Sequence, residues 1–321
     1  MRASVSGEGT SSDDGRRELD IRVGLGVFAS ANQLEHLLSI SRQVDLEAGQ
    51  VLFKEGDPAV QVFHVMSGVV ELRSPSAPLW TIEDAGTAGL IDFLLDRPHS
   101  RTAKTLSPTS VLELDAADYR DYLEDNFDVS HRILARMSSE LAAQSAVSGE
   151  TARMFGFDDG TRHIRRFAKV EIPVIDRMML LRRMPVFAHA STQALATLGQ
   201  GFKEVRFGAG DVIASAGERP SVVSVLVEGT VELTVLGGQP ARRTGHALLA
   251  HVEELADAPR LATVTAVGDV VALQIERDEL LDLLEEHFDL MLALFRFLTE
   301  CQEQMNDVNS SAGVPLGLAW R

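Results

Sequence analysis

The chain has 321 residues, of which 45% are hydrophobic and 24% charged, a composition typical of globular protein. A surface with a formal net charge of −17 repels phosphate backbones on average, so we expect no nucleic-acid partner. The single cysteine, Cys301, excludes an internal disulfide, and we expect its thiol on a buried helix face in a reducing compartment.

The first 22 residues are polar and rich in Ser, Gly and Asp, which predicts a disordered tail. They contain no apolar stretch of the signal-peptide type. No apolar run anywhere in the chain reaches the roughly 18 residues that a membrane span needs. These features together predict a cytoplasmic protein with no membrane span.

Residues 23–145 predict a first domain made mainly of short strands. The stretch "SANQLEHLLSI" opens with Ser30, a good helix N-cap. Short β-type runs separated by glycine follow it: "RQVDLEAG", "QVLFKEG", "QVFHVMSG" and "VVELRS". After a less regular middle come "TAKTLS" and "TSVLELD". A long closing helix would bury Tyr119, Leu123, Phe127, Ile133 and Leu134. Short, regularly spaced strands with turn signals favour a barrel or a jelly roll.

Residues 146–184 predict a helical linker of unusual charge. The segment contains eight Lys or Arg residues and five Asp or Glu residues, in an otherwise acidic chain. One interpretation is a pair of linker helices whose solvated basic face offsets the acidic domains. The other is a docking site for an acidic partner or an anionic lipid.

Residues 185–306 predict a second domain that repeats the first, and residues 307–321 predict a C-terminal tail. The repeat places equivalent glycines 161 positions apart, in the pairs Gly49 and Gly210, Gly56 and Gly217, and Gly68 and Gly229. The same offset continues to Phe127 and Phe288. We expect the second closing helix to run from about Arg277 to Gln304. Fixed glycine spacing over this length indicates duplication of one structural unit.

The glycine framework of both copies, together with "DAPRLATVTA" from Asp257, resembles the cyclic nucleotide-binding domain. That domain occurs in catabolite activator proteins, protein kinase A regulatory subunits and gated channels. The resemblance implies a mainly β fold with flanking helices, arranged as two tandem double-stranded β-helix (jelly-roll) barrels. It also implies a phosphate-binding cassette in each barrel, with a Gly for close approach, a Glu for the ribose hydroxyl and an Arg for the cyclic phosphate.

The first cassette departs from this pattern at two positions. It keeps Gly89, but Leu90 stands at the Glu position and cannot accept a hydrogen bond from a ribose. His99 stands at the Arg position, followed by Ser100 and Arg101. Arg101 could replace the missing arginine, since two residues along a strand preserve the face. We expect this pocket to be degenerate.

The second cassette keeps the phosphate-binding arginine at Arg260, which Leu261 and Ala262 follow. Ala250 stands at the Gly position and His251 at the Glu position, where it could act as a second donor. We therefore expect the second pocket to be the better anion site. No cofactor is expected, and cAMP or cGMP is the candidate ligand.

These features predict a non-enzymatic regulatory protein that senses cAMP, cGMP or another nucleotide-like anion and signals to a protein partner or through self-association. The alternative is a scaffold whose pockets have lost their ligand. The histidines lack metal-binding spacing, and no Walker or G-x-S-x-G motif occurs. We expect no helix-turn-helix, since the residues after the second copy are few, polar and broken by Gly and Pro. "GRREL" and "RRFAK" only partly match the inhibitory segment of kinase regulatory subunits.

Overall fold

The computed structural model describes residues 30–83, 86–148, 171–235, 240–249, 255 and 258–311. The expected N-terminal tail and both "RR" motifs lie outside these residues, as do Ala250 and His251. The described residues up to Ile133 form one compact unit and those from Leu134 form another. Within the described part of the chain, no helix is long and apolar enough to cross a membrane.

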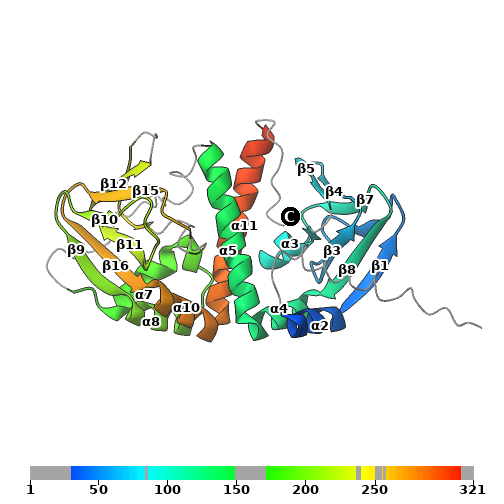
Figure 1. Cartoon of the computed structure of the whole chain (residues 1–321), viewed down its shortest axis with the longest axis horizontal. Coiled ribbons are helices and arrows are strands. Elements are labelled where there is room, and N and C mark those ends of the chain that lie inside the picture. The colour runs from blue at the N-terminus through cyan, green and yellow to red at the C-terminus, as the bar shows by residue number, and fades with distance from the viewer. Residues whose placement is uncertain are drawn as a thin grey trace, which may run out of the picture. The chain divides into compact units, whose positions relative to one another are not determined.

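The first unit begins with a capped helix and continues as two antiparallel sheets (Figure 1). Ser30 caps α2 (Ala31–Ser39), because its side chain accepts from the Gln33 backbone while the Gln33 side chain accepts from the Ser30 backbone. Strand orders are β1-β8-β3-β6 and β2-β7-β4-β5. The strands are β1 (Ser41–Leu46), β2 (Val51–Phe53), β3 (Gln61–Ser67), β4 (Val70–Ser74), β5 (Ala77–Ile82), β6 (Thr87–Ala88), β7 (Thr102–Thr105) and β8 (Thr109–Asp115).

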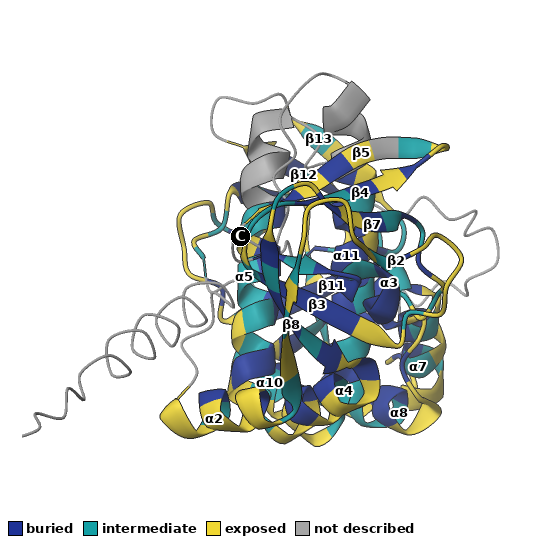
Figure 2. Ribbon diagram, turned by 90° about the vertical axis from the view of Figure 1, so that its right-hand side faces the viewer, coloured by how far each residue is buried: buried dark blue, intermediate teal, exposed yellow. Residues whose placement is uncertain are grey.

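Helices connect and close this barrel. Helix α3 (Leu90–Leu94) lies between β6 and β7, and α4 (Ala116–Asp125) and α5 (Phe127–Ser148) follow β8. Inward-facing side chains of both sheets form one apolar core, and Figure 2 shows β3 largely buried. The core consists of Phe53, Phe63, Val65, Val70, Leu72, Trp80, Ile82, Ala88, Ala103 and Val111.

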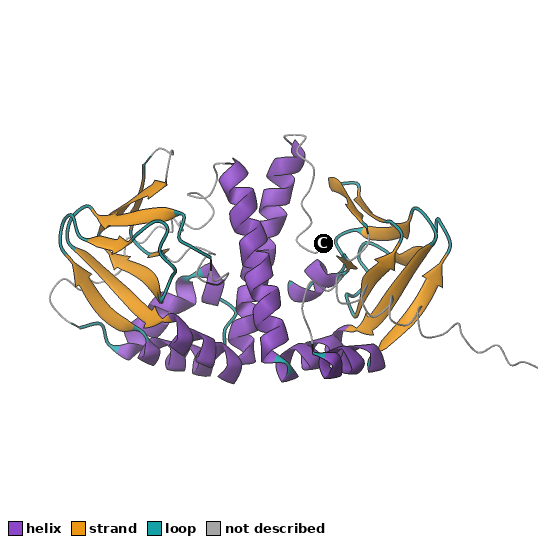
Figure 3. Ribbon diagram, viewed as in Figure 1, coloured by secondary structure: helices purple, strands orange, loops and turns teal. Residues whose placement is uncertain are grey.

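The second unit has the same architecture, with strands that form the barrel and helices at one end of it (Figure 3). Its sheets have the orders β14-β11-β16-β9 and β10-β15-β12-β13. The helices are α7 (Val174–Arg183), η1 (Pro185–Phe187), α8 (Thr192–Gly201), α10 (Arg277–Glu286) and α11 (Phe288–Ser311). The strands are β9 (Lys203–Phe207), β10 (Val212–Ala214), β11 (Val222–Glu228), β12 (Thr230–Val235), β13 (Ala241–Thr244), β14 (Ala247–Leu248), β15 (Ala262–Ala266) and β16 (Val270–Glu276).

The duplication is reproduced in single hydrogen bonds. The Gly56 amide donates to the His99 carbonyl at 2.8 Å, and the Gly217 amide donates to the Arg260 carbonyl at the same distance. Strand registers repeat as well, since β3 pairs with β8 and β11 pairs with β16 at positions that differ by the same 161 residues. The expected fold, two tandem jelly-roll barrels with flanking helices, is confirmed.

The closing helices differ from the expectation, because each is two helices rather than one. Asn126 and His287 adopt non-helical backbone angles (φ −126°, ψ 69° and φ −125°, ψ 82°). Asn126 also donates its side-chain amide to the Tyr122 carbonyl at 2.8 Å, which satisfies an end carbonyl of α4. The helix expected from Arg277 to Gln304 is therefore α10 followed by α11.

Two of the basic linker residues have structural contacts. Arg177 is buried, and its guanidinium donates to the carbonyl oxygens of Ile172 and Phe202. Arg182 donates to the carbonyl oxygens of Ala188 and Ala190. These side chains tie the start of the second unit together, which accounts for part of the linker's basic charge without a docking partner.

Candidate functional site

Gly89 holds the first cassette in a conformation that suits glycine. It lies at the N-terminus of α3 with φ +87°, in the left-handed region. A Cβ atom at this position would lie 3.0 Å from the Gln61 carbonyl oxygen and 3.1 Å from Cε1 of His99. Leu90, the next residue, is buried with only 4% of its surface exposed. The backbone therefore approaches the cassette as the family pattern requires, while an apolar side chain occupies the Glu position.

A buried carboxylate, which sequence reasoning missed, organises this cassette. Asp92 accepts hydrogen bonds from the Arg97 side chain at 2.8 Å and from the Ser100 amide at 3.0 Å. Burial by itself raises the pKa of this carboxyl, but contacts from His99, Ser100 and Arg97 outweigh burial, and the pKa lies below its ordinary value. Asp92 is thus ionised at neutral pH and committed to holding the cassette.

His99 is packed inside the first barrel. Its ring stacks on Phe53, with centroids 3.6 Å apart and an angle of 13° between the planes. Nδ1 lies 3.6 Å from the nearer Asp92 carboxylate oxygen. The side chain at the Arg position of the family therefore lies between an aromatic ring and a carboxylate.

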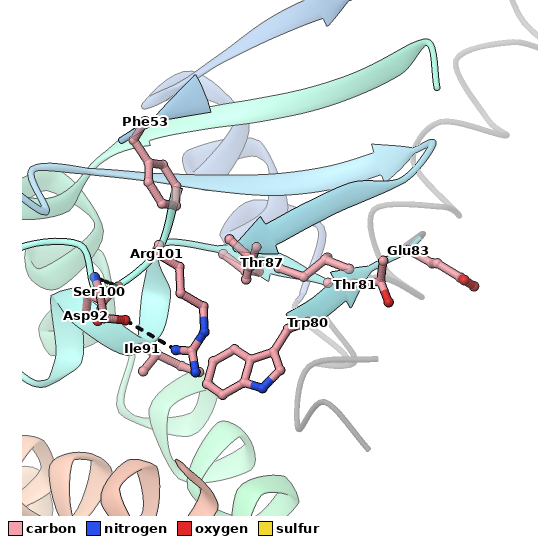
Figure 4. A pocket seen from close by; sticks show the side chains of 13 residues that line it. Phe53, Trp80, Thr81, Glu83, Thr87, Ile91, Asp92, Ser100 and Arg101 are labelled. Atoms are coloured by element: carbon pink, nitrogen blue, oxygen red, sulfur yellow. Dashed lines mark hydrogen bonds between the residues drawn. The ribbon is translucent and has the colours of Figure 1, made fainter. Parts of the chain in front are cut away.

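Arg101 does enter the cassette, as its alternation with His99 predicts, but it lies on an aromatic ring. Its Cζ is 3.3 Å from the centroid of the Trp80 ring, a close cation–π contact. Nη1 also donates to the Ser100 hydroxyl at 3.3 Å. Figure 4 shows this stack beside Ser100 and Asp92 in the pocket that these residues line. Both side chains are buried, so the stack fills interior space of the first barrel.

In the second barrel, the arginine at the family position is anchored to the protein backbone. Arg260 is half-buried, and its Nη2 donates to the Val222 carbonyl oxygen at 2.8 Å. Leu261 is 37% exposed, whereas Ala262 is buried at the start of β15. The described residues do not include the expected partners Ala250 and His251.

The two barrels differ most at the positions of the stack. In the first barrel Trp80 pairs with Leu72 across β4 and β5, and in the second Ala241 pairs with Leu233 across β12 and β13. Arg101 corresponds to Ala262 at the same offset. The second barrel therefore has alanine in both places where the first has a large side chain.

The sequence matches the model of the cyclic nucleotide-binding domain at residues 43–126 and 204–287, 168 of the 321 residues. The chain belongs to this family. The two matched segments are themselves 161 residues apart, in agreement with the hydrogen-bond repeat. The protein is thus a tandem member of the cyclic nucleotide-binding family.

A curated relative is a protein of Rhodopseudomonas palustris whose name describes a potassium channel protein. It is 28% identical to this cyclic nucleotide-binding chain over 115 residues. The match covers 35% of this chain and 28% of the relative, so the chain corresponds to under a third of that protein's length.

Several solved structures are similar to this tandem protein. The regulatory domain of Toxoplasma gondii PKA with cAMP is 15% identical, with a TM-score of 0.32, covering 86% of this chain and 94% of that one. A mutant regulatory subunit of a cAMP-independent protein kinase A from Trypanosoma brucei, bound to cAMP, is 14% identical, with a TM-score of 0.36 and coverage of 98% and 99%. The corresponding Trypanosoma cruzi subunit, bound to guanosine, is 15% identical, with a TM-score of 0.32 and coverage of 92% and 90%.

Other chemistry has little support in the described residues. They contain no group of three or more His, Cys, Asp or Glu side chains that could hold a metal ion. Cys301 is buried as expected, and burial, with Glu300 adding to it, raises the pKa of its thiol to about 12. The thiol is therefore protonated at neutral pH and a poor nucleophile.

Proposed function

We propose that the protein is a non-enzymatic regulatory sensor whose second barrel binds cAMP, cGMP or another nucleotide-like anion. The observation that supports this proposal is the replacement of the Trp80–Arg101 stack by Ala241 and Ala262. Both alanines are smaller than the side chains that they replace, so a ligand in the second barrel would have no such stack to displace. Arg260 stands at the position that the family uses for the cyclic phosphate, and its guanidinium carries donors suited to phosphate oxygens.

The first barrel has a different role in this proposal. Its Arg position holds a histidine stacked on Phe53, and its pocket contains the buried Trp80–Arg101 stack. A nucleotide would have to displace both contacts before it could enter. This filled pocket favours the alternative function for the first domain, a ligand-free module that contacts a protein.

A route from ligand to helix runs through two adjacent carbonyl groups at the start of β11. The Val222 carbonyl accepts from Arg260, and the Ser221 carbonyl accepts from the amide of Arg277, the first residue of α10, at 2.8 Å. A ligand phosphate that binds the Arg260 guanidinium would break its hydrogen bond to the Val222 carbonyl. That carbonyl is adjacent to the Ser221 carbonyl, which holds the first residue of α10. Ligand binding would thereby shift the population of α10 positions, and a protein partner or a second copy would sense the change.

Calorimetry with cAMP and with cGMP tests the proposal. We expect one site per chain, loss of binding in Arg260→Ala, and unchanged affinity in Arg101→Ala, because that arginine lies in the filled barrel. A flat titration at millimolar ligand, together with recovery of a stoichiometric protein partner from native cells, would instead establish the scaffold.

A further inference from the structure

One arginine of the second barrel faces the inside of the fold. Arg243 lies on β13, where it pairs with Val231 of β12. Val231 is fully buried in the apolar core of that barrel. Cross-strand partners project to the same face of a sheet. The Arg243 side chain therefore points toward the barrel interior, whereas its neighbour Arg242 points outward and pairs with Glu232 at 3.1 Å.

The guanidinium of Arg243 has unused hydrogen-bonding capacity. Nη1 donates to the Arg242 carbonyl at 3.2 Å. Nη2 is buried, and within the described part of the chain it has no hydrogen-bond partner. Burial also lowers the pKa of this arginine. The residue as a whole is half-buried, but a buried guanidinium nitrogen without an acceptor still opposes folding.

The fold itself does not require a cation here. The corresponding residue of the first barrel is Ile82, which pairs with Val70 and is 4% exposed in the core. The same strand pair is thus closed by an apolar side chain in one copy and by an arginine in the other. A destabilising inward cation in a barrel that also lacks the stack is best explained by a ligand that it contacts.

We infer that Arg243 is a ligand-binding residue of the second barrel, a second point of recognition besides Arg260. This inference rests on the proposed function and specifies the ligand further. Arginine carries donors only, so the group it contacts must be an acceptor, such as a phosphate oxygen, a keto oxygen or a ring nitrogen, and not an amino group. The forked guanidinium suits an acceptor pair at the edge of a planar ring or two oxygens of one phosphate.

The test measures affinity for cAMP and for cGMP by calorimetry in the full chain. Arg243→Ala should weaken binding by about 10- to 100-fold, the usual effect of losing a hydrogen bond to a charged group. Arg242→Ala is the matched control, because its side chain faces outward, and it should leave affinity unchanged. If Arg243 contacts the keto edge of a guanine, Arg243→Ala weakens the binding of cGMP far more than that of cAMP, because adenine has an amino group in place of the keto oxygen. If the acceptor belongs to the phosphate, the affinities for cAMP and cGMP fall by the same factor.

A second variant separates ligand contact from a structural role. Arg243→Ile installs the residue of the first barrel, so it should raise the melting temperature of the ligand-free chain while it weakens binding. A variant that melts earlier and binds as before would overturn the inference. If Arg260→Ala abolishes binding and Arg243→Ala does not, the proposed function stands and Arg243 has no part in it. If the unmodified chain binds neither nucleotide, both fail together.

Discussion

The Arg101 guanidinium lies over the Trp80 indole, with Cζ 3.3 Å from the ring centroid. Both side chains are buried, so the contact is shielded from water and should be stronger than its surface counterparts.

Removal of the indole should destabilise the chain far more than removal of the guanidinium. We expect Trp80→Ala to lower the free energy of unfolding by about 3–5 kcal/mol, since it leaves a large cavity. Arg101→Ala should cost about 1–2 kcal/mol. The double variant should lose less free energy of unfolding than the two single variants lose together. Losses that add up fully would show that the stack contributes no interaction energy. Urea unfolding measures all three.

Two glycines of the first barrel form a matched pair, one in the β2–β3 turn and one in the cassette. Gly56 and Gly89 have nearly the same φ, +88° and +87°, but a Cβ at Gly56 would meet nothing within 4 Å. Gly56→Ala should therefore cost only the conformational strain, about 1 kcal/mol. Gly89→Ala adds the close approach to Gln61 and His99 and should cost clearly more. Equal losses in urea unfolding would contradict the tight approach.

His64 should make the first domain sensitive to acid. Burial lowers the pKa of its imidazole to about 4, below its ordinary value of 6.5. The unfolded chain therefore takes up a proton at a higher pH than the folded chain does. Stability is fully present above pH 6.5 and falls as the pH drops toward 4, by about 3 kcal/mol in total.

Unfolding measured from pH 7 to pH 4 checks this prediction. His64→Val introduces the residue type found at the equivalent position of the second barrel, Val225. It should remove the contribution of His64 to the pH dependence of the free energy of unfolding. His189→Gln, at an exposed histidine, should leave the slope as it is. The same slope in His64→Val as in the parent would mean that other groups cause the acid sensitivity.

Arg177 should matter for folding rather than for partner binding. Because its guanidinium satisfies the carbonyls of Ile172 and Phe202, Arg177→Ala leaves both without that donor and should cost about 3 kcal/mol. Arg183→Ala, at an exposed position of the same helix, should change stability by less than about 0.5 kcal/mol. Thermal melts of both variants compare them directly, and equal melting temperatures would refute the structural role.

The barrels could be predicted because their turns depend on local rules. Glycines such as Gly49, Gly56 and Gly68 adopt positive φ between strands, so their spacing records the fold in the sequence. Strands β5 and β13 were not predicted, since no glycine frame marks them. Without their register, no pattern shows that Trp80 and Arg243 face inward, and these are the residues that set the two barrels apart.

The cassettes were only partly predictable for a related reason. Matching to the family pattern located Gly89, His99 and Arg260, since it compares position with position. It could not find Asp92, whose role depends on the Ser100 amide and the Arg97 side chain that the folded cassette brings to it. The sequence does place an acidic residue in the first turn of a short helix. Many solvent-exposed carboxylates occupy the same kind of position, so this pattern alone does not identify a buried one.

The alanines at positions 241 and 262 have a consequence for dose and response. If the pocket of the second barrel is open and that of the first is closed, each chain has a single ligand site. A single chain then binds its ligand hyperbolically, with a Hill coefficient of one. Steepness would then have to come from association between chains. A second ligand site in the first barrel would be the simplest way for a single chain to bind ligand cooperatively.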